Sequence, residues 1–217
     1  MNECVLCEGL KNNREIFNRP LYETDNFVIF PDRLPMADFH ILIVSKKHYI
    51  NIWDILNVGL ELELEKIIQH VNNRLISYGY KNIVLFEHGK AHKSETNGGK
   101  SVEHFHVHIV AEVPLLMQTL KKSHSEIIVY NSFDEMKIAQ GVLLDYLYVR
   151  DLSSSVMSVF TMENGIASQY IRLLLYSQMS KTLAEKLQIT GEYGFDWKTH
   201  DKVITPNIVD FYKKIII

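Results

Sequence analysis

The chain has 217 residues, of which 47% are hydrophobic and 23% are charged, and its formal net charge is −3. Such a composition is typical of a globular protein that buries a full core, as one large domain or two small ones, and it argues against a disordered chain. The negative charge disfavours an extended nucleic-acid surface, whereas a local basic pocket for a small phosphorylated ligand remains compatible with it.

The first residues, Met1-Asn2-Glu3-Cys4, contain neither a basic flank nor an apolar run. Nowhere does the sequence reach the roughly 18 uninterrupted apolar residues of a membrane span. We therefore expect a cytoplasmic protein without a membrane partner. In that compartment cysteines are expected to be thiols or metal ligands rather than a disulfide.

Cys4 and Cys7 have the Cys-x-x-Cys spacing that brings two thiolates together as zinc prefers. A redox pair and two packed free thiols remain open alternatives. A tetrahedral zinc site needs two further ligands, and candidates are His48, which follows an apolar run, and His104.

Two β-rich runs, 27–30 and 40–44, flank a loop that contains Pro31 and Pro35. Prolines favour a loop, so the pair predicts an antiparallel hairpin with a long connection. Asp32 lies at the end of the first run, where a carboxylate commonly caps a turn.

Apolar residues recur with helical spacing from about residue 57 to 78, and Gly79 suits the left-handed cap of a helix that ends there. A buried strand is expected at 83–86. The following polar loop, 90–100, contains glycines whose backbone N–H groups can approach a phosphate closely, although a surface loop with incidental lysines is the alternative.

Residues 104–110 read His-Phe-His-Val-His-Ile-Val, an alternation of imidazoles with bulky apolar side chains. Alternation with period two predicts a β-strand with one polar and one apolar face. Neighbouring histidines on that face are about 6.6 Å apart, which allows three different roles within one pocket.

The second half of the chain is less informative. Its patterns predict short helices at 114–122 and 133–139, strands at 127–130, 145–149 and 156–160, and an amphipathic helix at 167–187.

The run at 104–110 resembles the motif of the histidine triad (HIT) family, and Gly98-Gly99-Lys100-Ser101-Val102 resembles that family's Gly-Gly-Gln-Ser-Val lead-in. The resemblance extends over residues 1–113 and becomes weaker beyond them, where residues 168–172 and 196–198 resemble long members. It implies an α+β fold: an antiparallel sheet covered by helices in a catalytic domain, 1–113, with an α+β extension, 114–217, packed on it.

The resemblance assigns His106 as a nucleophile that attacks the α-phosphorus of a nucleotide and forms a covalent nucleotidyl-histidine. A neutral imidazole suits this role when a carbonyl holds its Nδ1–H and its Nε2 lone pair is free. His108 is then placed to bond phosphate oxygens or share proton transfer, and Ser101 to donate to a non-bridging oxygen. No Mg²⁺ is required by this mechanism.

The resemblance also implies binding roles. Asp32 would bind the ribose, Phe30 would contact the base, and Gly99 and Lys100 would cradle phosphate, Lys100 replacing the usual glutamine. Gln169 and Arg172 approach the site in long members, although Arg172 is equally interpretable as a helix-surface residue. Members that have the two cysteines bind a structural zinc ion, here through Cys4, Cys7, His48 and His104.

We therefore predict a nucleotide hydrolase acting on a dinucleoside polyphosphate or a nucleoside phosphoramidate. The alternatives are a nucleotidyl transferase or phosphorylase that uses another acceptor, and a zinc-stabilised nucleotide-binding module without turnover. Transferases of this superfamily commonly have glutamine in place of the third histidine, so His108 favours hydrolysis. A homodimer is compatible with the resemblance.

Overall fold

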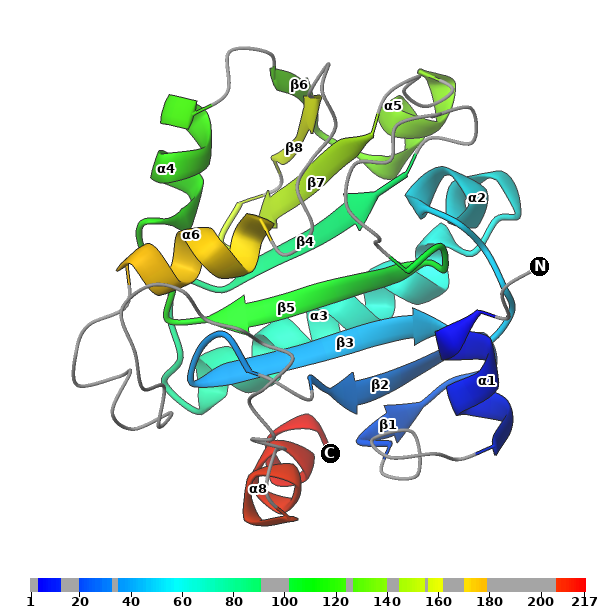
Figure 1. The fold of residues 1–217 in the computed structure, drawn as a ribbon, viewed down its shortest axis with the longest axis vertical. Helices are drawn as coiled ribbons and strands as arrows, with labels where there is room; N and C mark the ends of the chain where they lie inside the picture. The colour runs from blue at the N-terminus through cyan, green and yellow to red at the C-terminus, as the bar shows by residue number, and fades with distance from the viewer. Residues whose placement is uncertain are drawn as a thin grey trace.

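The computed structural model describes residues 4–12, 20–32, 35–90, 102–123, 127–139, 145–154, 156–161, 170–178 and 206–217. Its centre is one eight-stranded sheet in which each strand pairs antiparallel with its neighbours (Figure 1). In order across the sheet the strands are β1 (Tyr22–Glu23), β2 (Phe27–Pro31), β3 (Phe39–Ser45), β5 (His106–Ala111), β4 (Val84–Gly89), β7 (Tyr146–Asp151), β8 (Met157–Thr161) and β6 (Ile127–Tyr130).

Helices cover both faces of this sheet. The face that carries His106 and His108, here called the histidine face, packs against α1 (Val5–Asn12), α4 (Leu116–Ser123) and α6 (Tyr170–Gln178). The opposite face packs against α2 (Ile52–Asn57), α3 (Glu61–Ser77), α5 (Phe133–Ile138) and α8 (Pro206–Ile216). Figure 1 shows α6 in front of the sheet and α3 behind it.

Strand alternation explains both cores. In β5, Val107 and Ile109 point to the opposite face and join the larger core, which also contains Leu64 and Ile68 of α3. Val110 lies on the histidine face in a second core with α4 and α6. The α+β prediction is confirmed, as is the antiparallel pairing of the first two strands.

The helix predicted over 57–78 begins later than expected. Asn51 caps α2 by accepting a hydrogen bond from the backbone of Asp54, α2 ends at Asn57, and Gly59 then has φ +76°. This left-handed residue turns the chain before α3 begins, because glycine has no Cβ to clash there. Gly79, with φ +86°, follows the end of α3 as predicted.

The predicted strands of the second half are confirmed as β6, β7 and β8, and they continue the first half's sheet because β7 pairs with β4. The predicted helix at 167–187 is described only over α6. The last helix, α8, was not predicted. It packs along α3, where Arg74 donates to the carbonyl of Ile215 and His70 bonds that of Ile216. None of the described helices is long and apolar enough to cross a membrane.

Candidate active site and metal centre

His106 begins β5 and lies half-buried on the histidine face, opposite Val44 of β3. Its Nδ1 is 2.7 Å from the backbone oxygen of His104, so Nδ1–H donates and Nε2 keeps its lone pair. Burial lowers the pKa of His106, although the carbonyl of His104 and the carboxylate of Asp32 act in the other direction. The ring is therefore neutral near pH 7, with Nε2 available to attack an electrophile.

His108 is held by a chain of hydrogen bonds that fixes its tautomer. The backbone N–H of Met36 donates to Nδ1 of His40 (3.2 Å), so a neutral His40 carries its proton on Nε2. That Nε2–H lies 2.8 Å from Nδ1 of His108 and donates to it. His108 consequently carries its own proton on Nε2, where it can donate a hydrogen bond. Burial lowers the pKa of both rings well below the ordinary value, so both are neutral.

Asp32 and Arg172 meet beside these histidines. An oxygen of Asp32 lies 3.5 Å from Nε2 of His40, and the other lies 3.5 Å from Nη2 of Arg172. Both side chains are buried, so Arg172 is not a helix-surface residue; α6 brings it from the extension to the triad. Asp32 therefore lies between the guanidinium of Arg172 and the neutral ring of His40, which is a different environment from that of a residue that only caps a turn.

Two phenylalanines frame the same face. The ring of Phe86 on β4 is parallel to that of His108 at a centroid distance of 4.6 Å. Phe30 of β2 is 1% exposed and belongs to a buried cluster with Leu6 of α1 and Leu42 of β3. In this conformation Phe30 is therefore part of the core.

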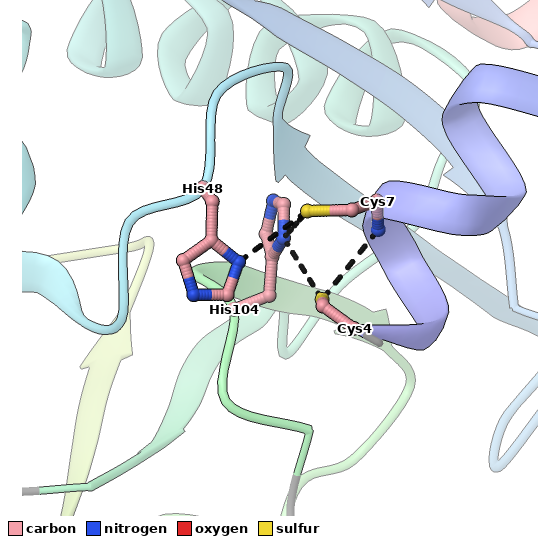
Figure 2. Close-up of side chains that lie close together, drawn as sticks. All are labelled: Cys4, Cys7, His48 and His104. Carbon is pink, nitrogen blue, oxygen red and sulfur yellow. Dashed lines mark hydrogen bonds between the residues drawn. The ribbon is translucent and has the colours of Figure 1, made fainter. Parts of the chain in front are cut away.

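The second cluster combines the N-terminal cysteines with two histidines (Figure 2). Sγ of Cys4 is 3.4 Å from Nδ1 of His104, and Sγ of Cys7 is 3.3 Å from Nδ1 of His48 and 3.4 Å from that of His104. The four ligand atoms all lie within 4.8 Å of one another. Burial, with Cys4 nearby, raises the pKa of the Cys7 thiol to about 11 in the absence of a cation.

These residues fit a tetrahedral zinc ion in their chemistry and spacing. Zinc bonds of about 2.3 Å to sulfur and 2.0–2.1 Å to nitrogen place neighbouring ligand atoms about 3.6 Å apart in a tetrahedron. Nε2 of His104 lies 2.8 Å from the carbonyl of Ser45, to which it donates, and this leaves Nδ1 unprotonated and directed at the thiols. The hydrogen bond orients the ring as a metal ligand requires.

Comparison with known proteins identifies the family. The family model described as "Scavenger mRNA decapping enzyme C-term binding" matches residues 3–124, which is more than half of the chain. An uncharacterised HIT-like protein of Chlamydia trachomatis is 34% identical over 93 residues, which cover 42% of this chain and 77% of that protein. The chain belongs to this histidine triad (HIT) family.

Other HIT proteins match about half of the chain. An uncharacterised 16.1 kDa HIT-like protein of Mycoplasma pneumoniae is 30% identical over 112 residues, covering 50% of this chain and 71% of that protein. A solved histidine triad protein from Clostridium difficile is 26% identical and covers 51% of this chain and 91% of that one, with a TM-score of 0.39. HIT membership indicates a nucleotide-processing enzyme.

Some predicted residues of the HIT site lie outside the described part of the chain. These are Gly99, Lys100 and Ser101 of the phosphate loop, together with Gln169. Their roles stay predictions. Next to the loop, Lys90 pairs with Glu103 and its carbonyl accepts a hydrogen bond from Asn51.

Two residues near the HIT triad were not found from the sequence. These are His88 of β4, on which the charge of His106 acts, and Asp145, which directly precedes β7 and whose charge also acts on His88. The one signal in the sequence is that positions 86 and 88 are two residues apart, so their side chains point to the same face of a strand. Parity places two residues on one face, but the sequence does not state which strand lies beside them.

Proposed function

We propose that this HIT protein is a nucleotide hydrolase that cleaves at the α-phosphate of a dinucleoside polyphosphate or a nucleoside phosphoramidate. The observation that carries the proposal is the orientation of His106. Its Nδ1–H is bound to a carbonyl, and its Nε2 lone pair is free on the face that also carries His108, whose ring centroid is 5.2 Å from that of His106.

In the first step the lone pair of His106 Nε2 attacks the α-phosphorus. The bond to the leaving group breaks as the N–P bond forms, and a nucleotidyl-histidine results. His108 Nε2–H donates to a non-bridging oxygen, which carries more charge in the transition state than in the substrate. In the second step water opens the N–P bond and releases the nucleoside monophosphate.

Arg172 and Asp32 support a binding role next to this centre. The guanidinium gives the buried site a fixed positive charge that suits a distal phosphate, and Asp32 has acceptor oxygens of the kind that bind ribose hydroxyls. A polyphosphate substrate accounts for a buried arginine in this position better than an uncharged ligand does.

The test uses diadenosine tetraphosphate and adenosine phosphoramidate labelled at the α-phosphate, quenched in base. The wild type is expected to show an acid-labile, base-stable protein adduct that decays to AMP. His106→Ala is expected to form none. The matched control is His70→Asn, an exposed histidine of α3 on the opposite face of the sheet. Equal turnover by wild type and His106→Ala would exclude the mechanism.

Adding inorganic phosphate to the same reaction distinguishes hydrolysis from transfer. A hydrolase yields AMP whether or not phosphate is present, whereas a phosphorylase yields ADP in proportion to the phosphate added. Stoichiometric binding with no adduct and no product would instead indicate a nucleotide-binding module without turnover.

We also propose that Cys4, Cys7, His48 and His104 hold one structural zinc ion. When bound, zinc would tie α1 to the chain segments after β3 and before β5 (Figure 2). Elemental analysis is expected to give about one zinc per chain, with loss of the metal and a lower melting temperature in Cys4→Ser. A metal-free wild type with the same melting temperature as Cys4→Ser would refute this.

A further inference from the structure

The proposed hydrolysis needs a proton acceptor in its second step, and the following inference rests on that proposed function. Water must lose a proton as it attacks the nucleotidyl-histidine. At that stage Nε2 of His106 is bonded to phosphorus and Nδ1–H is bonded to the carbonyl of His104. His106 therefore cannot accept the proton.

The other groups of the triad are also occupied. Nδ1 of His108 accepts from His40, Nδ1 of His40 accepts from a backbone N–H, and Nε2 of each ring already carries a proton. An oxygen of Asp32 lies 3.5 Å from the guanidinium of Arg172, so this carboxylate is already engaged in an ion pair. A separate base is required.

His88 is placed for this role by strand register. In the antiparallel pair β4–β5, Phe86 lies opposite His108. The paired register ends there, and continuing it by two residues on each strand would bring His88 opposite His106 on the same face. The stacking of Phe86 on His108 shows that even-numbered side chains of β4 reach the histidine face. His88 is half-buried, and it interacts electrostatically with His106.

Asp145 lies beyond His88 on the same face. On its other edge β4 pairs with β7, where His88 is opposite Leu147, a core residue of the histidine face. Asp145 is two residues before Leu147, so its side chain has the same parity. It is 5% exposed, and its charge acts on His88. His106 of β5, His88 of β4 and Asp145, directly before β7, thus follow one another along the histidine face.

We propose that His88, supported by Asp145, is the general base that takes a proton from the water attacking nucleotidyl-His106. The water oxygen forms a bond to phosphorus as one water proton passes to an unprotonated ring nitrogen of His88. The P–N bond breaks, and its electron pair returns to Nε2 of His106. The resulting imidazolium of His88 is stabilised by the Asp145 carboxylate until its proton passes to solvent.

The electrostatics of His88 agree with this role. Burial lowers the pKa of His88, the positive form of His106 lowers it further, and the Asp145 carboxylate opposes both effects. The ring is neutral before reaction near pH 7, as a base must be. Asp145 stabilises the charge that appears only when the proton arrives.

Single-turnover kinetics with α-labelled diadenosine tetraphosphate test the assignment. We expect His88→Asn to form the adduct at the wild-type rate and to hydrolyse it about 100-fold more slowly, which is the usual contribution of one general base. Asp145→Asn is expected to slow hydrolysis about tenfold. His70→Asn, on the opposite face, serves as the matched control.

Fluoride separates a base from a structural residue, because this anion attacks phosphorus without losing a proton. In His88→Asn, fluoride is expected to release the nucleotide from the adduct as fast as in the wild type. Unchanged water hydrolysis in His88→Asn overturns the inference, as does slowing of both steps without rescue by fluoride. A wild type that forms no adduct refutes the proposed function itself, and this inference with it.

Discussion

Glu87 is a carboxylic acid in the core of the protein, and its replacement by glutamine is expected to stabilise the fold at neutral pH. Its side chain points away from the histidine face, where it is 2% exposed and accepts a 2.7 Å hydrogen bond from the hydroxyl of Tyr146. Burial raises the pKa of Glu87 from 4.5 to about 8, with a smaller contribution from Asp54, although Tyr146 and the backbone of Ile52 oppose the shift.

The sign and size of the effect follow from proton linkage. Between pH 4.5 and about 8 the unfolded chain has an ionised Glu87 while the folded protein keeps it protonated. The stability of the wild type therefore falls by about 1.4 kcal/mol for each pH unit in this window. At pH 7, about 2.5 units above the unfolded value, the loss is about 3 kcal/mol. Glu87→Gln removes it and retains an acceptor for Tyr146.

Urea denaturation of wild type and Glu87→Gln from pH 4 to 9 measures this difference at constant zinc. The two proteins should have similar free energies of unfolding near pH 4, diverge steadily above pH 5, and differ by a constant amount above the folded pKa. Glu23→Gln, at an exposed carboxylate, controls for surface charge. A Glu87→Gln variant that is no more stable than wild type at pH 8 would show that Glu87 is ionised in the fold.

Two further substitutions test packing and the buried ion pair. A Cβ added at Gly89 would lie 1.9 Å from Cζ of Tyr146, so Gly89→Ala should cost about 3 kcal/mol of unfolding free energy in urea titrations. Gly59→Asn should cost about 1 kcal/mol, because nothing lies within 4 Å of its Cβ and asparagine tolerates the left-handed backbone better than other residues with a side chain. Arg172→Met removes the guanidinium and leaves the buried Asp32 beside neutral histidines, so the free energy of unfolding should fall by about 3 kcal/mol and the melting temperature with it. Adding Asp32→Asn to Arg172→Met should restore most of this stability. An additive double variant would contradict the pairing.

The structure could be predicted best from the sequence where a single strand shows a complete alternating pattern of its own. The alternation from His104 to Val110 defined β5 and its polar face, because side chains on a strand alternate by geometry alone. Spacing and family resemblance also selected the four residues whose ligand atoms the structure brings within 4.8 Å. Local sequence could not supply neighbours that are distant along the chain, such as β7 beside β4 or Arg172 beside Asp32.

The same limit explains the residues that were missed. His88 is not distinctive within its own strand, and Asp145 follows in the chain only after α4, β6 and α5. Their proximity depends on two strand registers, His88 with Leu147 and Phe86 with His108. Register is set by the packing of whole faces, so it becomes known only when the sheet is complete.

The two histidine clusters are joined through one residue, His104, and we therefore expect a change in the cysteine cluster to affect His106. Nδ1 of His104 faces the thiols, while its backbone carbonyl accepts the Nδ1–H that orients His106. Fixing the ring of His104 in the cysteine cluster therefore also fixes the acceptor that sets the tautomer of the nucleophile. We expect Cys4→Ser to lower the rate of adduct formation about tenfold, the equivalent of about one weakened hydrogen bond.

Nitrogen NMR of the His106 ring provides a readout that does not depend on turnover. In the wild type the Nδ1–H tautomer should dominate, and in Cys4→Ser the two neutral tautomers should exchange. Cys4→Ala combined with Cys7→Ala should show at least as much exchange, since it removes both thiol contacts to His104, of which Cys4→Ser removes one. If adduct formation and the His106 tautomer remain those of the wild type, the carbonyl is held by β3 and β5 alone, and the cysteine cluster stabilises only the position of α1.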